Sequence, residues 1–261
     1  LLSLVKDTLK IDTIRLNIWQ DTLGLQYEAD VAKNRFRHQE AFRANAHGYI
    51  RKGDGDIFVS YTNSHGEEGI HLGINIEKAS EGFDFHFYPE KPIIAFMHFT
   101  VNDNNYFRFK SLKEMDADLH LVSNSDASLW IHSDESPESM KEIMVELNQI
   151  DLKELSTKFT VIPSVKGLLN ATFRYVPMED SFMVVADGGV DDLYYESGRI
   201  GELLLNATYM PMDNGTHQVD LHAFHDMSEV ASLYLLYKGG RYESNINGEI
   251  SIDKLPLNIV N

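Results

Sequence analysis

Three histidines close together are the residues that most readily suggest a metal centre. His217, His222 and His225 fall within nine residues, and the chain has 11 histidines in all. Successive side chains of a β-strand point to opposite faces, so His217 and His225 share a face while His222 points away. A structural or catalytic metal needs three or four convergent donors. The spacing therefore predicts dispersed histidines and no metal site.

Two segments rich in Asp and Gly suggest calcium binding. They are Gly-Asp-Gly-Asp at 53–56 and Asp-Gly-Gly-Val-Asp-Asp at 187–192. Neither has the spacing of an EF-hand or of the nonapeptide calcium repeat. Asp and Gly are also the residues that tight turns with positive φ require. We therefore interpret both segments as hairpin turns.

Sequence motifs for catalysis are absent. The chain has no Gly-x-Ser-x-Gly elbow, phosphate-binding Gly-rich loop, dinucleotide fingerprint or His-Glu-x-x-His motif. It has no Cys, which excludes thiol nucleophiles, zinc–thiolate sites and disulfides. We expect no catalytic residue, no cofactor and no enzyme. A β-rich hydrolase whose carboxylates converge only in three dimensions is an alternative, because carboxylate pairs are recognised by their separation.

The charge balance excludes one large class of partner. Lys and Arg number 23 against 40 Asp and Glu, for a formal net charge of -17 at pH 7. A nucleic-acid binder needs a basic face to neutralise phosphates, so nucleic acid is not an expected partner. The chain is 43% hydrophobic and 24% charged, as is typical of folded domains. No stretch reaches the roughly 18–20 consecutive apolar residues of a bilayer span.

The elements that carry these side chains follow a period of two. Apolar and polar residues alternate at 14–18, 23–31, 57–61, 70–76, 83–87, 119–121, 129–131, 143–147, 171–175, 219–223 and 246–252. Alternation of this kind places the apolar side chains on one face of a strand and the polar ones on the other. Turn signals recur at roughly 8–12 residues, which is typical of all-β chains. The predicted fold class is antiparallel all-β, with one apolar and one polar face.

Helical signals are few. Residues 1–9 carry apolar side chains that fit one or two amphipathic turns, and residues 151–159 fit a short helix. Asp151 and Glu154 have the offset of a capping box at the start of that helix. Residues 140–147 have helical propensity, but Ile143, Val145 and Leu147 keep the two-residue alternation, which favours a strand.

An internal repeat is visible. Leu-Leu-Asn-Ala-Thr-Phe at 168–173 recurs as Leu-Leu-Asn-Ala-Thr-Tyr at 204–209, an offset of 36 residues, and Pro-Met-acid follows each copy. Ile-Asp-Leu-Lys-Glu-Leu at 150–155 also resembles Ile-Asp-Lys-Leu at 252–255. Repeats of this period are typical of stacked arrays. No linker composition divides the chain, so residues 1–261 are predicted to form a single β-repeat segment.

Alternating apolar side chains are the candidate binding surface. In a closed sandwich they would form a packed core, whereas in a curled sheet they would line an open hydrophobic groove. An apolar groove would bind acyl chains or an apolar peptide, because apolar surface is costly to leave in water. The candidate groove-lining residues are Ile57, Val59, Ile70, Leu72, Ile74, Phe83, Phe85, Phe87, Phe107, Phe109, Leu119, Leu121, Ala171, Phe173, Val219 and Leu221.

Several segments also carry a family resemblance. These segments are Glu-Lys-Pro-Ile-Ile at 90–94, Phe-Thr-Val-Asn-Asp-Asn-Asn-Tyr at 99–106, Ile-Asp-Leu-Lys-Glu-Leu at 150–155, the repeated Leu-Asn-Ala-Thr, and Leu-Pro-Leu-Asn-Ile-Val-Asn at 255–261. With them, the chain from about Ile11 onward resembles the AsmA-like, TamB-type translocation and assembly module proteins of Bacteroides-like bacteria. The motifs carry no chemistry of their own.

The resemblance implies a long periplasmic chain of a Gram-negative bacterium, tethered to the inner membrane by an N-terminal helix. It implies an elongated, taco-like sheet whose groove carries phospholipid or outer-membrane protein segments, in outer-membrane biogenesis. The outer-membrane assembly machinery would be a partner through other regions. The first residue is Leu1, and we expect an interior fragment, without the leader, the tether helix or the C-terminal domain of the family.

A binding module of another class is the alternative function. A carbohydrate-binding or cell-surface β-sandwich would present Trp and Tyr in a flat patch on its polar face. The chain has two Trp, Trp19 and Trp130, and 12 Tyr. An aromatic patch on the polar face would favour this alternative, and a continuous apolar face would favour the groove.

Overall fold

A computed structural model describes residues 4–6, 9–22, 24–36, 42–134, 140–158, 163–212, 214–239 and 245–253. The chain divides into two compact units. Unit 1 comprises Leu1–Phe109 and Leu121–Asn124, and unit 2 comprises Lys110–His120 and Ser125–Asn261. A single β-repeat segment over 1–261 stays a prediction.

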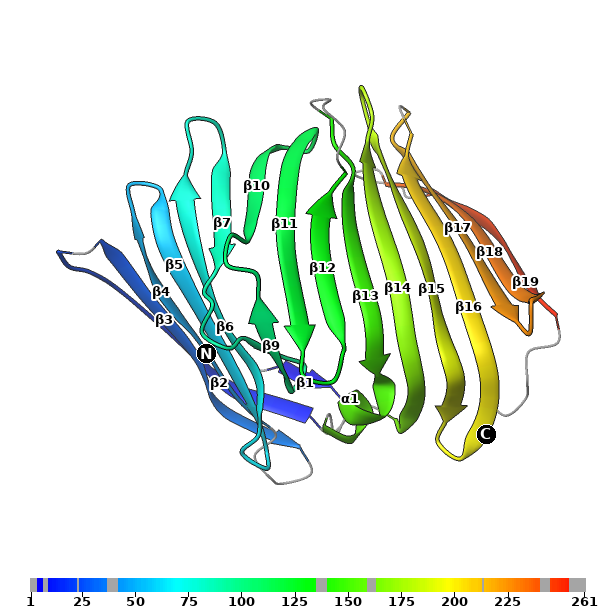
Figure 1. Cartoon of the computed structure of the whole chain (residues 1–261), viewed down its shortest axis with the longest axis horizontal. Helices are drawn as coiled ribbons and strands as arrows, with labels where there is room; N and C mark the ends of the chain where they lie inside the picture. Colours follow the sequence, from blue (N-terminus) through cyan, green and yellow to red (C-terminus); the bar gives the residue numbers. More distant parts are fainter. Residues whose placement is uncertain are drawn as a thin grey trace. The chain divides into compact units, whose positions relative to one another are not determined.

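Unit 1 is built from short and medium antiparallel strands. Its strands are β1 (Leu4–Lys6), β2 (Leu9–Gln20), β3 (Leu25–Phe36), β4 (Phe42–Arg51), β5 (Asp54–Asn63), β6 (Glu68–Lys78), β7 (Phe83–Phe87), β8 (Ile93–Ile94), β9 (Met97–Val101) and most of β10 (Tyr106–Ser111). Consecutive strands pair from β1 to β7. Strand β6 also pairs with β8, and β10 returns to pair with β7 (Figure 1).

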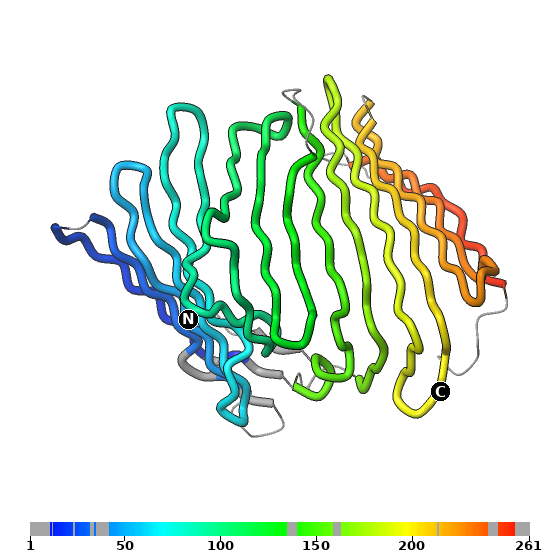
Figure 2. The backbone as a smooth tube through the Cα atoms, in the orientation of Figure 1, coloured from blue at the N-terminus to red at the C-terminus, as the bar shows by residue number. Residues whose placement is uncertain are grey.

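Unit 2 is a simpler antiparallel succession. It contains most of β11 (Glu114–Ser123), then β12 (Ser128–Ser133), β13 (Ile143–Asp151), α1 (Leu152–Lys158), β14 (Val165–Pro177), β15 (Phe182–Tyr195), β16 (Gly198–Pro211), β17 (Thr216–His225), β18 (Ser228–Lys238) and β19 (Asn245–Ile252). Each strand from β12 to β19 pairs with the next, and the backbone can be followed hairpin by hairpin in Figure 2. The antiparallel all-β fold class is confirmed.

The helix predictions have mixed outcomes. Asp151 Oδ1 accepts hydrogen bonds from the backbone N–H of Lys153 at 2.8 Å and of Glu154 at 3.4 Å, so it caps α1 as predicted. Residues 143–147 lie in β13, which confirms the strand there. The prediction of a helix at the start of the chain was wrong, because residues 4–6 and 9–20 pair as strands β1 and β2. Among the helices of the described segments, none has the length and apolarity to cross a bilayer.

Only one of the two Asp/Gly segments forms a turn. At 53–56 the chain passes from β4 to β5, with positive φ at Lys52 and Gly53. Segment 187–192 lies inside β15 instead, so the turn prediction there was wrong. Its glycines serve close packing: a Cβ on Gly188 would meet Ala171 Cβ at 3.0 Å, and one on Gly189 would meet Leu204 Cδ2 at 2.5 Å.

The internal repeat corresponds to two strands on either side of β15. Residues 168–173 lie in β14 and residues 204–209 lie in β16. Ala171 is in register with Gly188, and Gly188 is in register with Leu205 rather than with Ala207, the repeat equivalent of Ala171. The two copies are therefore staggered by two residues, which keeps equivalent side chains on the same face. Residues 254–261, which include the end of the segment 252–255, lie outside the described residues.

One glycine of unit 1 gives a stability prediction. A Cβ on Gly48 would collide with the carbonyl oxygen of Asp56 and lie 2.7 Å from the hydroxyl of Tyr27. That hydroxyl donates to the same carbonyl at 3.0 Å. We expect Gly48→Ala to lower the free energy of unfolding by about 1–3 kcal/mol, because the strand backbone must shift. Urea unfolding followed by circular dichroism measures this, and an unchanged midpoint would contradict the close approach.

Candidate functional site

The candidate groove residues of unit 1 lie on one face of its sheet. In an antiparallel pair, residues in register project their side chains to the same side. Ile57 is in register with Ile74, and Ile74 with Phe87. The same face carries all ten of the unit 1 candidates from β5, β6, β7 and β10: Ile57, Val59, Ile70, Leu72, Ile74, Phe83, Phe85, Phe87, Phe107 and Phe109.

This apolar face extends beyond the predicted residues. Leu16 is in register with Ala29, Ala29 with Ala46, and Ala46 with Val59, so the face runs from β2 to β5. The opposite face is polar, as the row Arg15, Asp30, Asn45, Ser60 and His71 illustrates. Leu16 is 63% exposed and Phe83 39% exposed. The face is thus apolar and accessible to solvent at both of these positions.

A cavity of about 670 Å³ opens on the apolar face of unit 1. Its apolar wall is formed by Ile50, Ile57, Ile76 and Phe83, from β4 to β7. The turn between β4 and β5 and two tyrosines complete the lining: Tyr27, Tyr49, Gly53, Asp54, Gly55 and Asp56. Because Ile50, Gly55 and Ile76 are register partners, the cavity floor is one cross-strand row.

A buried carboxylate, that of Asp56, accepts hydrogen bonds on the face of β5 opposite to Ile57. Asp56 Oδ1 accepts a hydrogen bond from the Tyr88 hydroxyl at 2.7 Å and from Asn75 Nδ2 at 3.0 Å. Burial, then the hydrogen bond to Asp56 and its charge, raise the pKa of Tyr88 to about 12. Burial raises the pKa of Tyr27, and the charge of Asp56 raises that of Tyr49. The three phenols stay protonated, which suits a structural hydrogen-bond network.

The raised pKa of Tyr88 makes stability depend on alkaline pH. Its folded pKa of about 12 exceeds the ordinary value of 10.0, so the folded state favours the neutral phenol. This contribution is fully present below pH 10 and is lost as the pH rises towards 12. We expect the free energy of unfolding to fall over that window, and to fall less in Tyr88→Phe. Urea titrations from pH 8 to pH 12 measure this, and identical pH profiles for the two proteins would contradict it.

The candidate residues of unit 2 also share one face. Phe173 is in register with Ala186, Ala186 with Ala207, and Ala207 with Leu221. Ala171 lies in the adjacent row of that face, and Val219 in the row beyond Phe173. Further residues complete the face, namely Leu129, Ile131, Val145, Leu147, Leu205, Leu233, Leu235 and Ile250. The opposite face carries rows such as Glu146, Thr172, Asp187, Asn206 and His222.

The apolar face of unit 2 has a shallow centre. Ala171, Ala186, Gly188 and Ala207 form a small-residue floor across β14, β15 and β16. A cavity of about 250 Å³ lies over this floor, walled by larger side chains: Leu147, Leu169, Phe173, Val190, Leu203, Leu205 and Leu221. Asp187 also borders it, but its carboxylate accepts a hydrogen bond from Asn206 on the opposite face at 2.7 Å. The side chains that surround the cavity are therefore apolar.

Leu119 and Leu121 differ from the other candidates. They are 3% and 0% exposed, so neighbouring side chains cover them completely. They lie in β11, and Leu121 is in register with Val101 of β9 within unit 1. By contrast, Phe173 and Leu205 around the small-residue floor are 41% and 43% exposed. The structure therefore places Leu119 and Leu121 in packed interior rather than on an accessible surface.

Five rings form a line along the end of the unit 2 face. We call Tyr175, Phe182, Tyr209, His217 and Tyr237 the aromatic border; they come from β14, β15, β16, β17 and β18 in turn. Successive ring centroids are 5.2, 5.9, 5.9 and 6.1 Å apart. The Tyr209 hydroxyl is 2.8 Å from His217 Nδ1, and the Tyr175 hydroxyl donates to the Leu112 carbonyl at 2.8 Å. The border thus combines apolar rings with polar tips.

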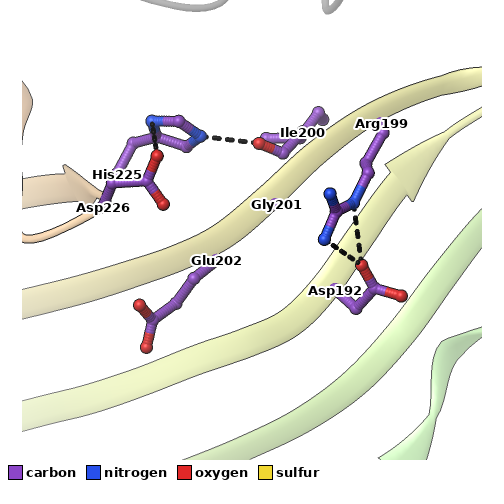
Figure 3. Close-up of a pocket in the computed structure, with 7 residues that line it drawn as sticks. All are labelled: Asp192, Arg199, Ile200, Gly201, Glu202, His225 and Asp226. Carbon is purple, nitrogen blue, oxygen red and sulfur yellow. Dashed lines mark hydrogen bonds and ion pairs between the residues drawn. The ribbon is translucent and has the colours of Figure 1, made fainter.

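The opposite end of the same strands carries a polar pocket (Figure 3). Its volume is about 390 Å³, and Arg199 forms an ion pair with Asp192 Oδ1 at 3.0 Å. His225 Nε2 lies 2.6 Å from the Ile200 carbonyl oxygen, and its Nδ1 lies 3.6 Å from Asp226 Oδ2. Glu202 adds a third carboxylate to the lining. A ligand there would meet charge rather than apolar surface.

The three clustered histidines are arranged as the spacing predicts. His217 and His225 lie on the apolar face of β17, whereas His222 is in register with Asn206 and Ser232 on the polar face. His217 and His225 are eight residues apart, or about 27 Å along a strand. Within the described ranges, no group of three His, Cys, Asp or Glu side chains is placed to hold a metal ion.

Sequence reasoning missed the small-residue floor and the aromatic border. Gly188 falls in the segment 187–192 that was interpreted as a turn, Ala186 directly precedes that segment, and Ala171 was chosen without its partners. The border residues are separated by 7 to 27 residues along the chain, and only the register of five strands aligns them. The repeated Leu-Asn-Ala-Thr was the one signal that could have indicated the floor, because both of its alanines lie in it.

Comparison of the chain with protein-family models, with curated proteins and with solved structures found no match.

Proposed function

We propose that this protein binds the acyl chains of phospholipids on its apolar faces and serves their transit between membranes. The observation that carries the proposal is the cavity of about 250 Å³ over the small-residue floor of unit 2, which apolar side chains surround on an accessible face. Uncovered apolar surface of this kind costs about 25 cal/mol per Å², so a bound apolar chain stabilises it.

Trp19 lies on the polar face of unit 1 and is 46% exposed, so the case for acyl chains over sugars rests on unit 2. A carbohydrate-binding module presents aromatic rings on an accessible polar face. Here Trp130 belongs to the polar face, but its indole stacks on His132 at 3.8 Å and donates to Asp118 at 3.3 Å. The exposed apolar residues of unit 2 are aliphatic at its far strand, where Ile246 and Ile250 are both 70% exposed. An acyl chain is the ligand that fits such a surface.

The cellular setting follows from the family resemblance and is part of the proposal. An AsmA-like or TamB-type chain would place these faces in the periplasm of a Gram-negative bacterium, as one length of a path in outer-membrane biogenesis. Outer-membrane protein segments are the second cargo that the resemblance implies. The aliphatic lining of the floor favours lipid, since it offers a peptide backbone no hydrogen-bonding partner among the side chains that surround the cavity.

Lipid uptake from vesicles tests the proposal. The delipidated protein is incubated with phosphatidylethanolamine–phosphatidylglycerol vesicles, the vesicles are removed by flotation, and phospholipid in the protein fraction is quantified. We expect at least one phospholipid per chain to remain with the protein. Recovery of protein without phospholipid, in a sample that keeps its β-sheet circular dichroism, would contradict the proposal.

A further inference from the structure

We propose that the aromatic border binds the phosphate and glycerol region of the phospholipid whose acyl chain lies on the small-residue floor. This inference rests on the proposed function and assigns a polar subsite to it. The border and the floor share one face of unit 2, and Tyr209 is two residues from Ala207 on the same strand. Residues two apart on a strand are roughly 7 Å apart. The polar part of a lipid would thus lie one row away from its chain.

The chemistry across the rows changes in the order that a lipid requires. The floor row at Ala186 and Ala207 is small and aliphatic, and the next row contains Tyr175 and Tyr209. The outermost row contains Phe182, His217 and Tyr237. Tyr and His present an apolar body and a polar tip, which is why such rings are found where hydrocarbon meets the polar headgroups of a membrane.

The hydrogen-bonding tips suit an anionic oxygen. In the tautomer in which the Tyr209 hydroxyl donates to Nδ1, the His217 ring keeps its N–H at Nε2. The His217 N–H and the Tyr237 hydroxyl are donors, whereas the hydroxyls of Tyr209 and Tyr175 already donate to His217 Nδ1 and to the Leu112 carbonyl. Hydrogen bonds to a charged acceptor are stronger than neutral ones. The border therefore offers donors without a fixed ion pair.

The two ends of the unit 2 strands differ in the groups that a phosphate would meet. At the far end, Asp192 is paired with Arg199, and the carboxylates of Glu202 and Asp226 line the same pocket. A phosphate there would meet two further negative charges. The border end also carries two carboxylates, Glu179 and Asp180, in the turn between β14 and β15, where Lys113 Nζ donates to the Glu179 carbonyl. The border is chosen because its rings lie one row from the floor, so that a phosphate there leaves its chain directed toward the floor.

The test compares one lipid with and without its phosphoethanolamine headgroup. A fluorescent fatty acid bound to the protein is displaced by dioleoyl phosphatidylethanolamine or by dioleoylglycerol, both delivered from vesicles. We expect the wild-type protein to prefer the phospholipid at least tenfold. The double variant Tyr209→Phe, His217→Phe keeps both rings and removes both polar tips. We expect it to lose most of this preference, with dioleoylglycerol affinity unchanged within twofold.

The possible results distinguish failure of the headgroup site from failure of the proposed acyl-chain binding. If the wild-type protein binds both lipids equally, or the double variant keeps the full preference, the border does not bind the headgroup and acyl binding stands. If neither lipid displaces the probe, the proposed function fails as well. Glycerol 3-phosphate is the water-soluble probe: saturable binding that shifts the His217 ring resonances without any acyl chain would indicate a free-phosphate site and overturn the lipid assignment.

Discussion

The variant Ala207→Phe is expected to lose acyl-chain binding by at least tenfold, which corresponds to about 1.4 kcal/mol. Ala207 lies in the small-residue floor, between Ala186 of β15 and Leu221 of β17. A phenyl ring at this position fills the cavity of about 250 Å³ that an acyl chain would occupy. The loss of affinity is measured by titrating a fluorescent fatty acid with each protein.

The matched control is Thr208→Phe. Thr208 is the next residue of β16 and lies on the opposite face, in register with Val185 and Asp220. The same ring is added there without entering the cavity. We expect the control to bind the fatty acid within twofold of the wild-type protein. Equal affinity for Ala207→Phe and Thr208→Phe would contradict the placement of the chain on the floor.

The second large effect is expected from charge on the apolar face of unit 1. Phe85 is in register with Ile76 and with Phe107, and Leu72 is in register with Val59. A carboxylate in contact with an acyl chain loses hydration and gains no partner, which costs several kcal/mol. We expect the double variant Leu72→Asp, Phe85→Asp to lose phospholipid from unit 1, so that vesicle uptake falls by about half or more while unit 2 still binds.

The control for this variant adds a carboxylate to the polar face. His71 is exposed, neighbours Leu72 in β6 and is in register with Ser60 of β5. His71→Asp is expected to leave lipid uptake unchanged. Because charge on an apolar face also affects stability, β-sheet content is checked by circular dichroism before uptake is measured. If the double variant is folded and takes up as much phospholipid as the wild-type protein, unit 1 binds no lipid.

Much of the architecture could be predicted from the alternation of residue types. Ile57, Val59, Leu72 and Phe85 share a face because each strand has a period of two and its neighbours pair in register. The cap of α1 was predictable because Asp151 acts on amide groups within three residues of itself. Both features depend on local geometry, which sequence spacing represents well.

The features that failed depend on distant residues. Segment 187–192 has the composition of a turn, yet it pairs with both neighbouring strands as part of β15, with Gly188 close to Ala171. Leu119 has the same alternation as Leu221, but one is fully buried and the other borders a cavity. Burial is decided by what packs against a strand face, and spacing along one strand carries no information about that.

Native mass spectrometry of the protein purified without detergent, with lipid extraction of the same sample, tests the central claim most directly. The account predicts adducts of phospholipid mass on the folded chain, and extracted phospholipid in proportion to them. It also predicts that these adducts are reduced in Ala207→Phe and retained in Thr208→Phe. A clean mass of the unliganded chain, with no phospholipid acquired after incubation with liposomes, would contradict lipid binding by these apolar faces.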